Sequence, residues 1–142
     1  MILLDTRGLL AAIDASQHRH REAVDALRGA APPWVLSPFV LAELDYLLAT
    51  RAGMAAERAL LAEVGRGVYR LEAFDADDVG DAERVIGRYA SFGIGLADAS
   101  LVVLAGRYGV RGVLTLDERH FRVLRAAGGR TFRILPADAI VA

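Results

Sequence analysis

The chain has 142 residues, of which 54% are hydrophobic and 25% are charged, and its formal net charge is −1. This size and composition predict one ordinary globular domain spanning residues 1–142, without a disorder signature or a sequence repeat. No apolar run approaches the roughly 18 residues of a membrane span, and Asp5 interrupts the N-terminal stretch where a signal peptide would be apolar. We therefore expect a cytoplasmic protein with no membrane association.

The basic residues exclude some chemistry, because all 17 are arginines and the chain has no lysine. A mechanism that depends on a catalytic lysine is ruled out, and any phosphate contact must come from Arg, His or backbone amides. The chain has no cysteine either, which excludes disulfide bonds and thiolate metal sites. The overall charge does not indicate a nucleic-acid-binding protein.

Short apolar runs alternate with helical patterns along the chain. The expected strands are at residues 1–4, 34–37, 67–74, 112–116 and 132–135. The expected helices are at residues 6–14, 18–29, 38–51, 54–65, 75–90, 96–109 and 118–127. This alternation predicts a three-layer α/β/α fold, in which helices cover both faces of a central, mainly parallel sheet.

Two aspartates stand where apolar strands end, Asp5 after "MILL" and Asp117 after "VLTL". Parallel sheets bind ligands outside the carboxyl ends of their strands, so both carboxylates are candidates for a site. Either one taken alone is better explained as a helix N-cap. Further acidic residues are needed to decide between these readings.

Two helical carboxylates, Asp98 and Glu43, share a face with apolar side chains. A buried carboxylate without a partner is costly, so such residues usually pair with a cation. Asp45 also has apolar neighbours on its side of the helix, and periodicity alone does not choose between Glu43 and Asp45. An exposed carboxylate paired with arginine remains the simpler alternative for each helical position.

If these four carboxylates meet in one cleft, their mutual repulsion requires a cation. Oxygen ligands alone favour Mg²⁺ or Mn²⁺, whereas Zn²⁺ is disfavoured without cysteine or clustered histidine. An acidic metal cleft of this kind suits hydrolysis of a phosphodiester bond. The carboxylate chemistry does not distinguish RNA from DNA as the substrate.

The order of four short motifs resembles the PIN domain, and more narrowly the VapC toxins of bacterial toxin–antitoxin pairs. The motifs are Asp5 in "LLDT", Glu43 in "VLAEL", Asp98 in "LADASL" and Asp117 in "LTLDERHF". The resemblance covers essentially the whole chain and implies a Mg²⁺- or Mn²⁺-dependent endoribonuclease that cuts transfer or ribosomal RNA to inhibit translation. It also implies a homodimer, assembled further with a VapB-type antitoxin whose C-terminal segment occupies the cleft.

The resemblance assigns metal-binding and catalytic roles to the four acids and a catalytic role to Thr115, the hydroxyl two residues before the last acid. Thr6 matches a small hydroxyl residue that commonly follows the first Asp, whereas Arg7 departs from the small residue common there. The expected RNA-contacting side chains are Thr6, Arg7, Arg119, His120 and Arg122. Glu118 is interpreted as an exposed acid in the first turn of its helix.

Other proteins that gather carboxylates at strand ends fit less well. A receiver domain needs a lysine, which this chain lacks, and a haloacid-dehalogenase-type phosphatase needs a second aspartate where Arg7 stands. A PIN-like domain that has lost catalysis and serves only for binding or assembly is the main rival. The complete set of four acids argues against that rival.

Overall fold

The computed structural model describes residues 1–139, and a sheet of five strands forms its centre. The strands are β1 (Ile2–Leu4), β2 (Trp34–Leu36), β3 (Arg70–Leu71), β4 (Gly112–Leu114) and β5 (Arg133–Leu135). Their order across the sheet is β3-β2-β1-β4-β5, and each of the four pairings is parallel. The predicted central parallel sheet is confirmed.

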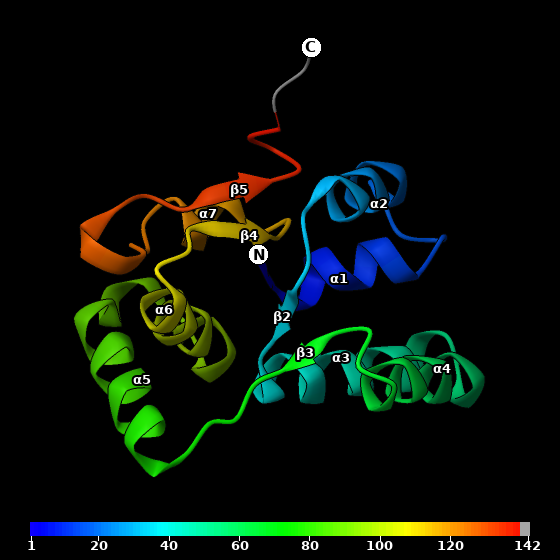
Figure 1. Cartoon of the computed structure of the whole chain (residues 1–142), viewed down its shortest axis with the longest axis horizontal. Coiled ribbons are helices and arrows are strands. Elements are labelled where there is room, and N and C mark those ends of the chain that lie inside the picture. The colour runs from blue at the N-terminus through cyan, green and yellow to red at the C-terminus, as the bar shows by residue number, and fades with distance from the viewer. Residues whose placement is uncertain (140–142) are drawn as a thin grey trace.

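Helices cover both faces of this sheet, which gives the three predicted layers. They are α1 (Thr6–Ile13), α2 (His20–Gly29), α3 (Pro38–Arg51), α4 (Met54–Gly65), α5 (Ala76–Arg88), α6 (Leu96–Tyr108) and α7 (Glu118–Phe121), with 3₁₀ turns η1 (Ala90–Phe92) and η2 (Ala127–Gly129). In Figure 1, α1 to α4 lie on one side of the strands, and α5 and α6 lie on the other. Within residues 1–139, no helix is long and apolar enough to cross a bilayer.

The centre of the core is β1 with its two neighbours, β2 and β4. Their inner residues, Leu3, Leu4, Val35, Leu36, Val113 and Leu114, are completely inaccessible to solvent. Such runs without polar alternation are typical of parallel strands that helices cover on both faces. These strands are short, and their buried ends bring the residues that follow them close together.

Helix α1 packs very closely against the end of β4, and Gly8 permits this approach. A Cβ atom at Gly8 would lie 2.3 Å from the carbonyl oxygen of Leu114 and 2.8 Å from the amide nitrogen of Thr115. The same Leu114 carbonyl accepts a hydrogen bond from the amide of Asp5, at 2.9 Å. The spacing of β1, α1 and β4 is therefore fixed by backbone contacts beside Asp5.

Two predicted elements are shortened to half their expected length or less. The strand predicted at 67–74 is reduced to β3, because it lies at the sheet edge and only Arg70 and Leu71 pair with the short strand β2. The helix predicted at 118–127 ends at Phe121, so the prediction for residues 122–127 was wrong. There the Arg125 side chain donates to the carbonyls of residues 122–124, and Arg125 then pairs with Thr131 in an isolated bridge. Backbone hydrogen bonds of the helical type continue only to Leu124, whose amide donates to the His120 carbonyl, whereas the amide of Ala126 donates to the Arg130 carbonyl.

Candidate metal centre and RNA-cleavage site

The candidate site lies where the direction of the chain across the sheet reverses. From β1 the chain moves to β2 and β3, and then returns to β4 on the other side of β1. Ligands of open parallel sheets bind at such a switch point, outside the carboxyl ends of the strands. Asp5 directly follows β1, and Asp117 lies three residues beyond the end of β4.

The four predicted carboxylates come together in one cleft of about 210 Å³. It is lined by Asp5, Thr6, Arg7, Glu43, Leu47, Gly95, Ala97, Asp98, Asp117 and His120. Asp98 is in the first turn of α6, and Glu43 is in the second turn of α3. The cleft therefore combines carboxylates from two strand ends with carboxylates from two helices on opposite sides of the sheet.

The structure shows which of two acids of α3, Glu43 or Asp45, faces the cleft. The helical period of the sequence could not decide between them. Glu43 lines the cleft, whereas Asp45 does not. The nearby carboxyl group of Asp45 raises the pKa of Glu57 in α4, so Asp45 faces that helix. The expectation that an apolar stripe buries Glu43 was wrong, because Glu43 is exposed at the edge of the cleft. The buried residues of α3 are Val40, Leu44 and Leu48.

The hydroxyl groups of two threonines form hydrogen bonds with three of the four acidic residues. The Thr115 hydroxyl donates to Asp5 Oδ2 at 2.6 Å and accepts from the amide of Asp117 at 2.9 Å. Thr6 donates to Glu43 Oε2 at 2.9 Å, which links the start of α1 to α3. Thr115 is almost completely buried, so its hydroxyl fixes Asp5 against the loop after β4 rather than contacting solvent.

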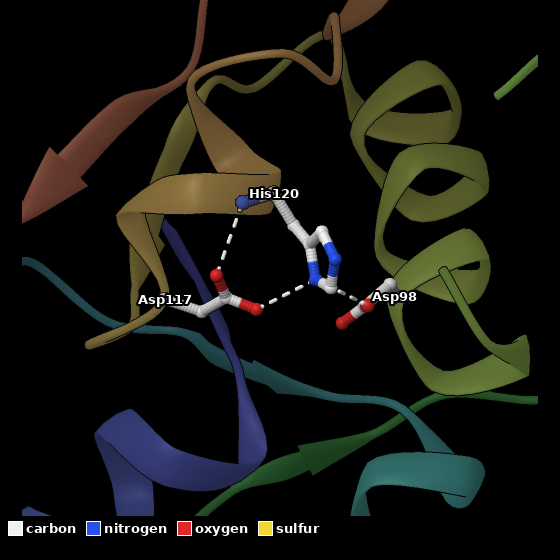
Figure 2. A group of neighbouring side chains, drawn as sticks. All are labelled: Asp98, Asp117 and His120. Atoms are coloured by element: carbon white, nitrogen blue, oxygen red, sulfur yellow. Dashed lines mark hydrogen bonds and ion pairs between the residues drawn. The ribbon is translucent and has the colours of Figure 1, made fainter. Parts of the chain in front are cut away.

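The imidazole of His120 lies between the carboxylates of Asp98 and Asp117 (Figure 2). Its Nδ1 is 2.8 Å from Asp117 Oδ2 and 3.5 Å from Asp98 Oδ2, and its Nε2 is 3.0 Å from the carbonyl oxygen of Phe92. The amide of His120 also donates to Asp117 Oδ1 at 3.0 Å. His120 was predicted from the sequence to contact RNA. In the structure its imidazole ring faces Asp98 and Asp117.

Burial and like charge disfavour ionisation of two of these carboxyl groups. Burial is the main reason why the pKa of Asp5 is raised to about 7, and the negative charges of Asp98 and Asp117 raise this pKa further. The hydrogen bond from Thr115 acts in the opposite direction and lowers the pKa of Asp5. Burial also raises the pKa of Asp98 to about 6, with the charge of Asp117 as the next cause. Within residues 1–139, no arginine forms an ion pair with any of the four cleft acids. The cleft thus has an excess of negative charge that a bound cation would relieve.

A buried pair of serines joins the two helices that carry Glu43 and Asp98. Ser37 accepts from the amide of Phe39 as the N-cap of α3, and its hydroxyl lies 2.7 Å from that of Ser100 in α6. Ser100 donates to the carbonyl of Ala97 at 2.6 Å, so Ser37 is the donor between the two hydroxyls. This pair was not predicted. Ser37 before Pro38 is an N-cap signal, but nothing in the sequence indicates its link to Ser100.

The arginines expected to contact RNA are not equally placed. Arg7 is exposed and lines the cleft, whereas Arg119 and Arg122 do not line it. Arg122 forms ion pairs with Glu118 at 2.9 Å and with Asp138 at 2.7 Å, which raise its pKa. Two carboxylates thus already occupy the Arg122 guanidinium, and Glu118 is the exposed surface acid that was expected.

Comparison with known proteins assigns the chain to a family. Residues 2–127 match the family model described as "PIN domain". This chain therefore belongs to the PIN-domain family. It is 44% identical over 135 residues to Ribonuclease VapC26 of Mycobacterium tuberculosis, an alignment that covers 95% of this chain and all of that protein.

A solved structure agrees with this assignment. The chain matches the crystal structure of Mycobacterium tuberculosis VapC20, described as a sarcin-ricin loop cleaving toxin, with a TM-score of 0.78 and 26% sequence identity. The match covers 83% of this chain and 91% of VapC20. Together these relationships identify the chain as a VapC-type ribonuclease, an RNA-cleaving toxin and a hydrolase, rather than a PIN-like module without catalysis.

Proposed function

We propose that this single-domain chain is a metal-dependent endoribonuclease whose cation is held by Asp5, Glu43, Asp98 and Asp117. The convergence of these four carboxylates in one cleft, without an arginine partner among the described residues, is the observation that carries the proposal. The donor set is dominated by carboxylate oxygen, which suits Mg²⁺ or Mn²⁺. Two cleft carboxyl groups with raised pKa values are the groups that a cation would stabilise in their ionised form.

Each part of the chain has a distinct task in this proposal. The bound cation would supply Lewis-acid activation of the scissile phosphate and of a water molecule. Thr115 positions Asp5 and the backbone of Asp117, and Thr6 positions Glu43, through the hydrogen bonds described above. Arg7 at the cleft rim is suited to contact an RNA phosphate, and Arg119, exposed in α7, is a second such candidate.

Structured RNA of the translation apparatus, transfer or ribosomal RNA, is the proposed substrate. The structural relative VapC20 cleaves the sarcin-ricin loop, which makes ribosomal RNA the first substrate to test. Cleavage there would inhibit translation and would place the protein in the cytoplasm. Naked total RNA, intact ribosomes and duplex DNA should be compared, because carboxylate chemistry alone would also serve a DNA nuclease.

The proposal predicts discrete RNA cleavage that requires metal and Glu43 but not Asp45. Purified protein should cut RNA with Mg²⁺ or Mn²⁺ and lose cleavage in EDTA. Glu43→Gln should lower the cleavage rate by about 100-fold or more, since it removes a charge from the site. Asp45→Asn, two residues along the same helix but outside the cleft, should retain nearly the full rate. Cleavage that persists in EDTA, or equal losses in the two variants, would refute this assignment.

Metal affinity should depend on pH. A cation must displace the protons of Asp5 and Asp98, whose pKa values in the metal-free protein are about 7 and about 6. Apparent affinity should therefore rise by about tenfold or more between about pH 5.5 and about pH 8, and then level off. Calorimetric titration with Mn²⁺ in buffers of different ionisation enthalpy measures both the affinity and the protons released. A constant affinity without proton release would show that the acids are already ionised.

A VapB-type antitoxin is the proposed protein partner, and it would bind over the cleft. A second, mainly apolar depression adjoins the acidic cleft and shares Glu43 and Leu47 with it. Tyr46 in this depression is 68% exposed. An apolar segment carrying a basic residue would fit both surfaces together.

Exposed apolar side chains of α4, Met54 and Leu61, support the further proposal of a homodimer that assembles with the antitoxin.

A further inference from the structure

We propose that His120 Nδ1 is a ligand of the cation held by Asp98 and Asp117, and that this nitrogen makes the site prefer Mn²⁺ to Mg²⁺. The inference rests on the proposed function, because it concerns the same metal centre. It adds a nitrogen ligand to a site that the sequence presents as composed of oxygen alone. It also gives His120 a role in the metal centre instead of a role in binding RNA.

The spacing of the three side chains fits coordination by one ion. An octahedral ion with metal–ligand distances of about 2.1 Å has neighbouring ligand atoms about 3 Å apart. His120 Nδ1 lies 2.8 Å from Asp117 Oδ2 and 3.5 Å from Asp98 Oδ2, distances on either side of that value. One ligand atom from each of the three residues lies within 4.8 Å of the other two. Only small side-chain movements would therefore bring all three atoms onto one ion.

The opposite side of the imidazole ring determines which nitrogen is available. The Phe92 carbonyl is only an acceptor, so Nε2 must carry the hydrogen in the 3.0 Å contact between them. In the metal-free protein a hydrogen lies between Nδ1 and Asp117 Oδ2, which are 2.8 Å apart. A cation that displaces this proton would take the lone pair of Nδ1, which points at the two carboxylates (Figure 2). Metal-binding histidines almost always donate their other ring N–H to a carbonyl, a carboxylate or water. Phe92 in η1 provides that carbonyl.

A hydrogen bond from the backbone amide of His120 also fixes the position of the imidazole ring relative to Asp117. The amide of His120 donates to Asp117 Oδ1, so the short helix α7 holds Asp117 and His120 in one unit. Asp98 approaches from α6, on a separate element. The three side chains are half-buried, which leaves the site open to an ion and its remaining water ligands. This arrangement is ready for coordination without rearrangement of the backbone.

The chemistry of the nitrogen ligand leads to the metal preference. Mg²⁺ is a hard ion that is bound through oxygen and keeps several water molecules. Imidazole binds transition-metal ions more favourably, and carboxylates are also good ligands of Mn²⁺. Two carboxylates with one imidazole should therefore hold Mn²⁺ more tightly than Mg²⁺. Removing the imidazole should reduce this difference.

The direct test is electron spin-echo spectroscopy of the Mn²⁺-loaded protein, which detects a nitrogen atom bonded to the ion. Wild-type protein should show nitrogen modulation, and it should change when histidine alone is labelled with ¹⁵N. The chain has three histidines, so His18→Gln serves as the matched control and should keep the signal. His120→Gln should lose it, because the glutamine amide can still reach the Phe92 carbonyl but places no nitrogen at the Nδ1 position.

Binding measurements then test the preference. His120→Gln should weaken Mn²⁺ binding by about tenfold or more and Mg²⁺ binding by less than about threefold. Bound Mn²⁺ without nitrogen modulation in the wild type, or modulation retained in His120→Gln, would overturn the role of His120 while leaving the carboxylate site intact. Binding of Mg²⁺ but not of Mn²⁺ by the wild type would overturn this inference alone. Failure to bind either ion would overturn the proposed metal-dependent function as well. Thermal unfolding of both variants verifies that they fold.

Discussion

Asp5→Asn is expected to abolish RNA cleavage and, above pH 7, to make the metal-free protein more stable than the wild type. Loss of a charged ligand removes several kcal/mol of metal-assisted stabilisation, and about 4 kcal/mol corresponds to roughly a thousandfold in rate. The fold should survive, because an asparagine oxygen can still accept the hydrogen bond from Thr115. The same substitution therefore separates catalysis from folding.

The gain in stability follows from the raised pKa of Asp5, which is about 7 in the folded protein against 3.8 as the ordinary value. When folding raises the pKa of a group, the group stabilises the folded state fully at a pH below its pKa in the unfolded chain. This contribution is lost as the pH rises through the pKa of the group in the folded protein. The metal-free wild type should therefore lose up to about 4 kcal/mol between pH 4 and pH 7 from this group. Asparagine has no such loss.

Thermal unfolding in EDTA at pH 5 and pH 8 measures this effect. The melting temperature of Asp5→Asn should exceed that of the wild type by about 5–10 °C at pH 8 and by much less at pH 5. Asp77→Asn, at an exposed position in α5, is the control and should change neither activity nor its pH dependence. A destabilised Asp5→Asn protein at pH 8 would show that the wild-type carboxylate already has a compensating partner.

Gly8→Ala should be the most destabilising substitution of a single methyl group near the site. The new Cβ atom would lie 2.3 Å from the Leu114 carbonyl oxygen, and the neighbouring atoms belong to backbone that cannot rotate away. We expect a loss of about 3 kcal/mol, the upper part of the usual range for overpacking, despite the higher helix propensity of alanine. Helix α1 would have to move away from β4.

That movement would also impair catalysis, because Asp5 lies at the start of α1 and Thr115 lies just beyond β4. Displacement by about 1 Å can lower an enzymatic rate by about 100-fold. Gly106→Ala in α6 is the matched control, since its new Cβ would meet no side chain and no backbone beyond its own stretch of helix within 4 Å; it should be neutral or slightly stabilising. Denaturant unfolding and RNA cleavage of both variants provide the measurements. Equal stability of the two variants would show that α1 can shift at little cost.

The three-layer fold could be predicted from residue patterns alone, because runs of apolar residues alternate with helical patterns and require helices on both faces of a parallel sheet. The sequence also identified the four carboxylates, since Asp5 and Asp117 end buried strands and the motif order resembles the PIN family. Comparison with known proteins supports that family and its ribonuclease activity. The four acids predicted from the sequence line one cleft in the structure, and their roles in metal binding and catalysis stay predictions.

The contacts that these acids make with other side chains could not be predicted from residue patterns and became clear from the packing of the folded chain. Periodicity could not separate Glu43 from Asp45, because α3 packs on more than one side, and only the contact with Thr6 places Glu43 at the cleft. The direction of the His120 ring depends on the carbonyl of Phe92, 28 residues earlier in the chain. Such contacts join elements whose separation is set by packing, and local sequence patterns carry no information about that separation.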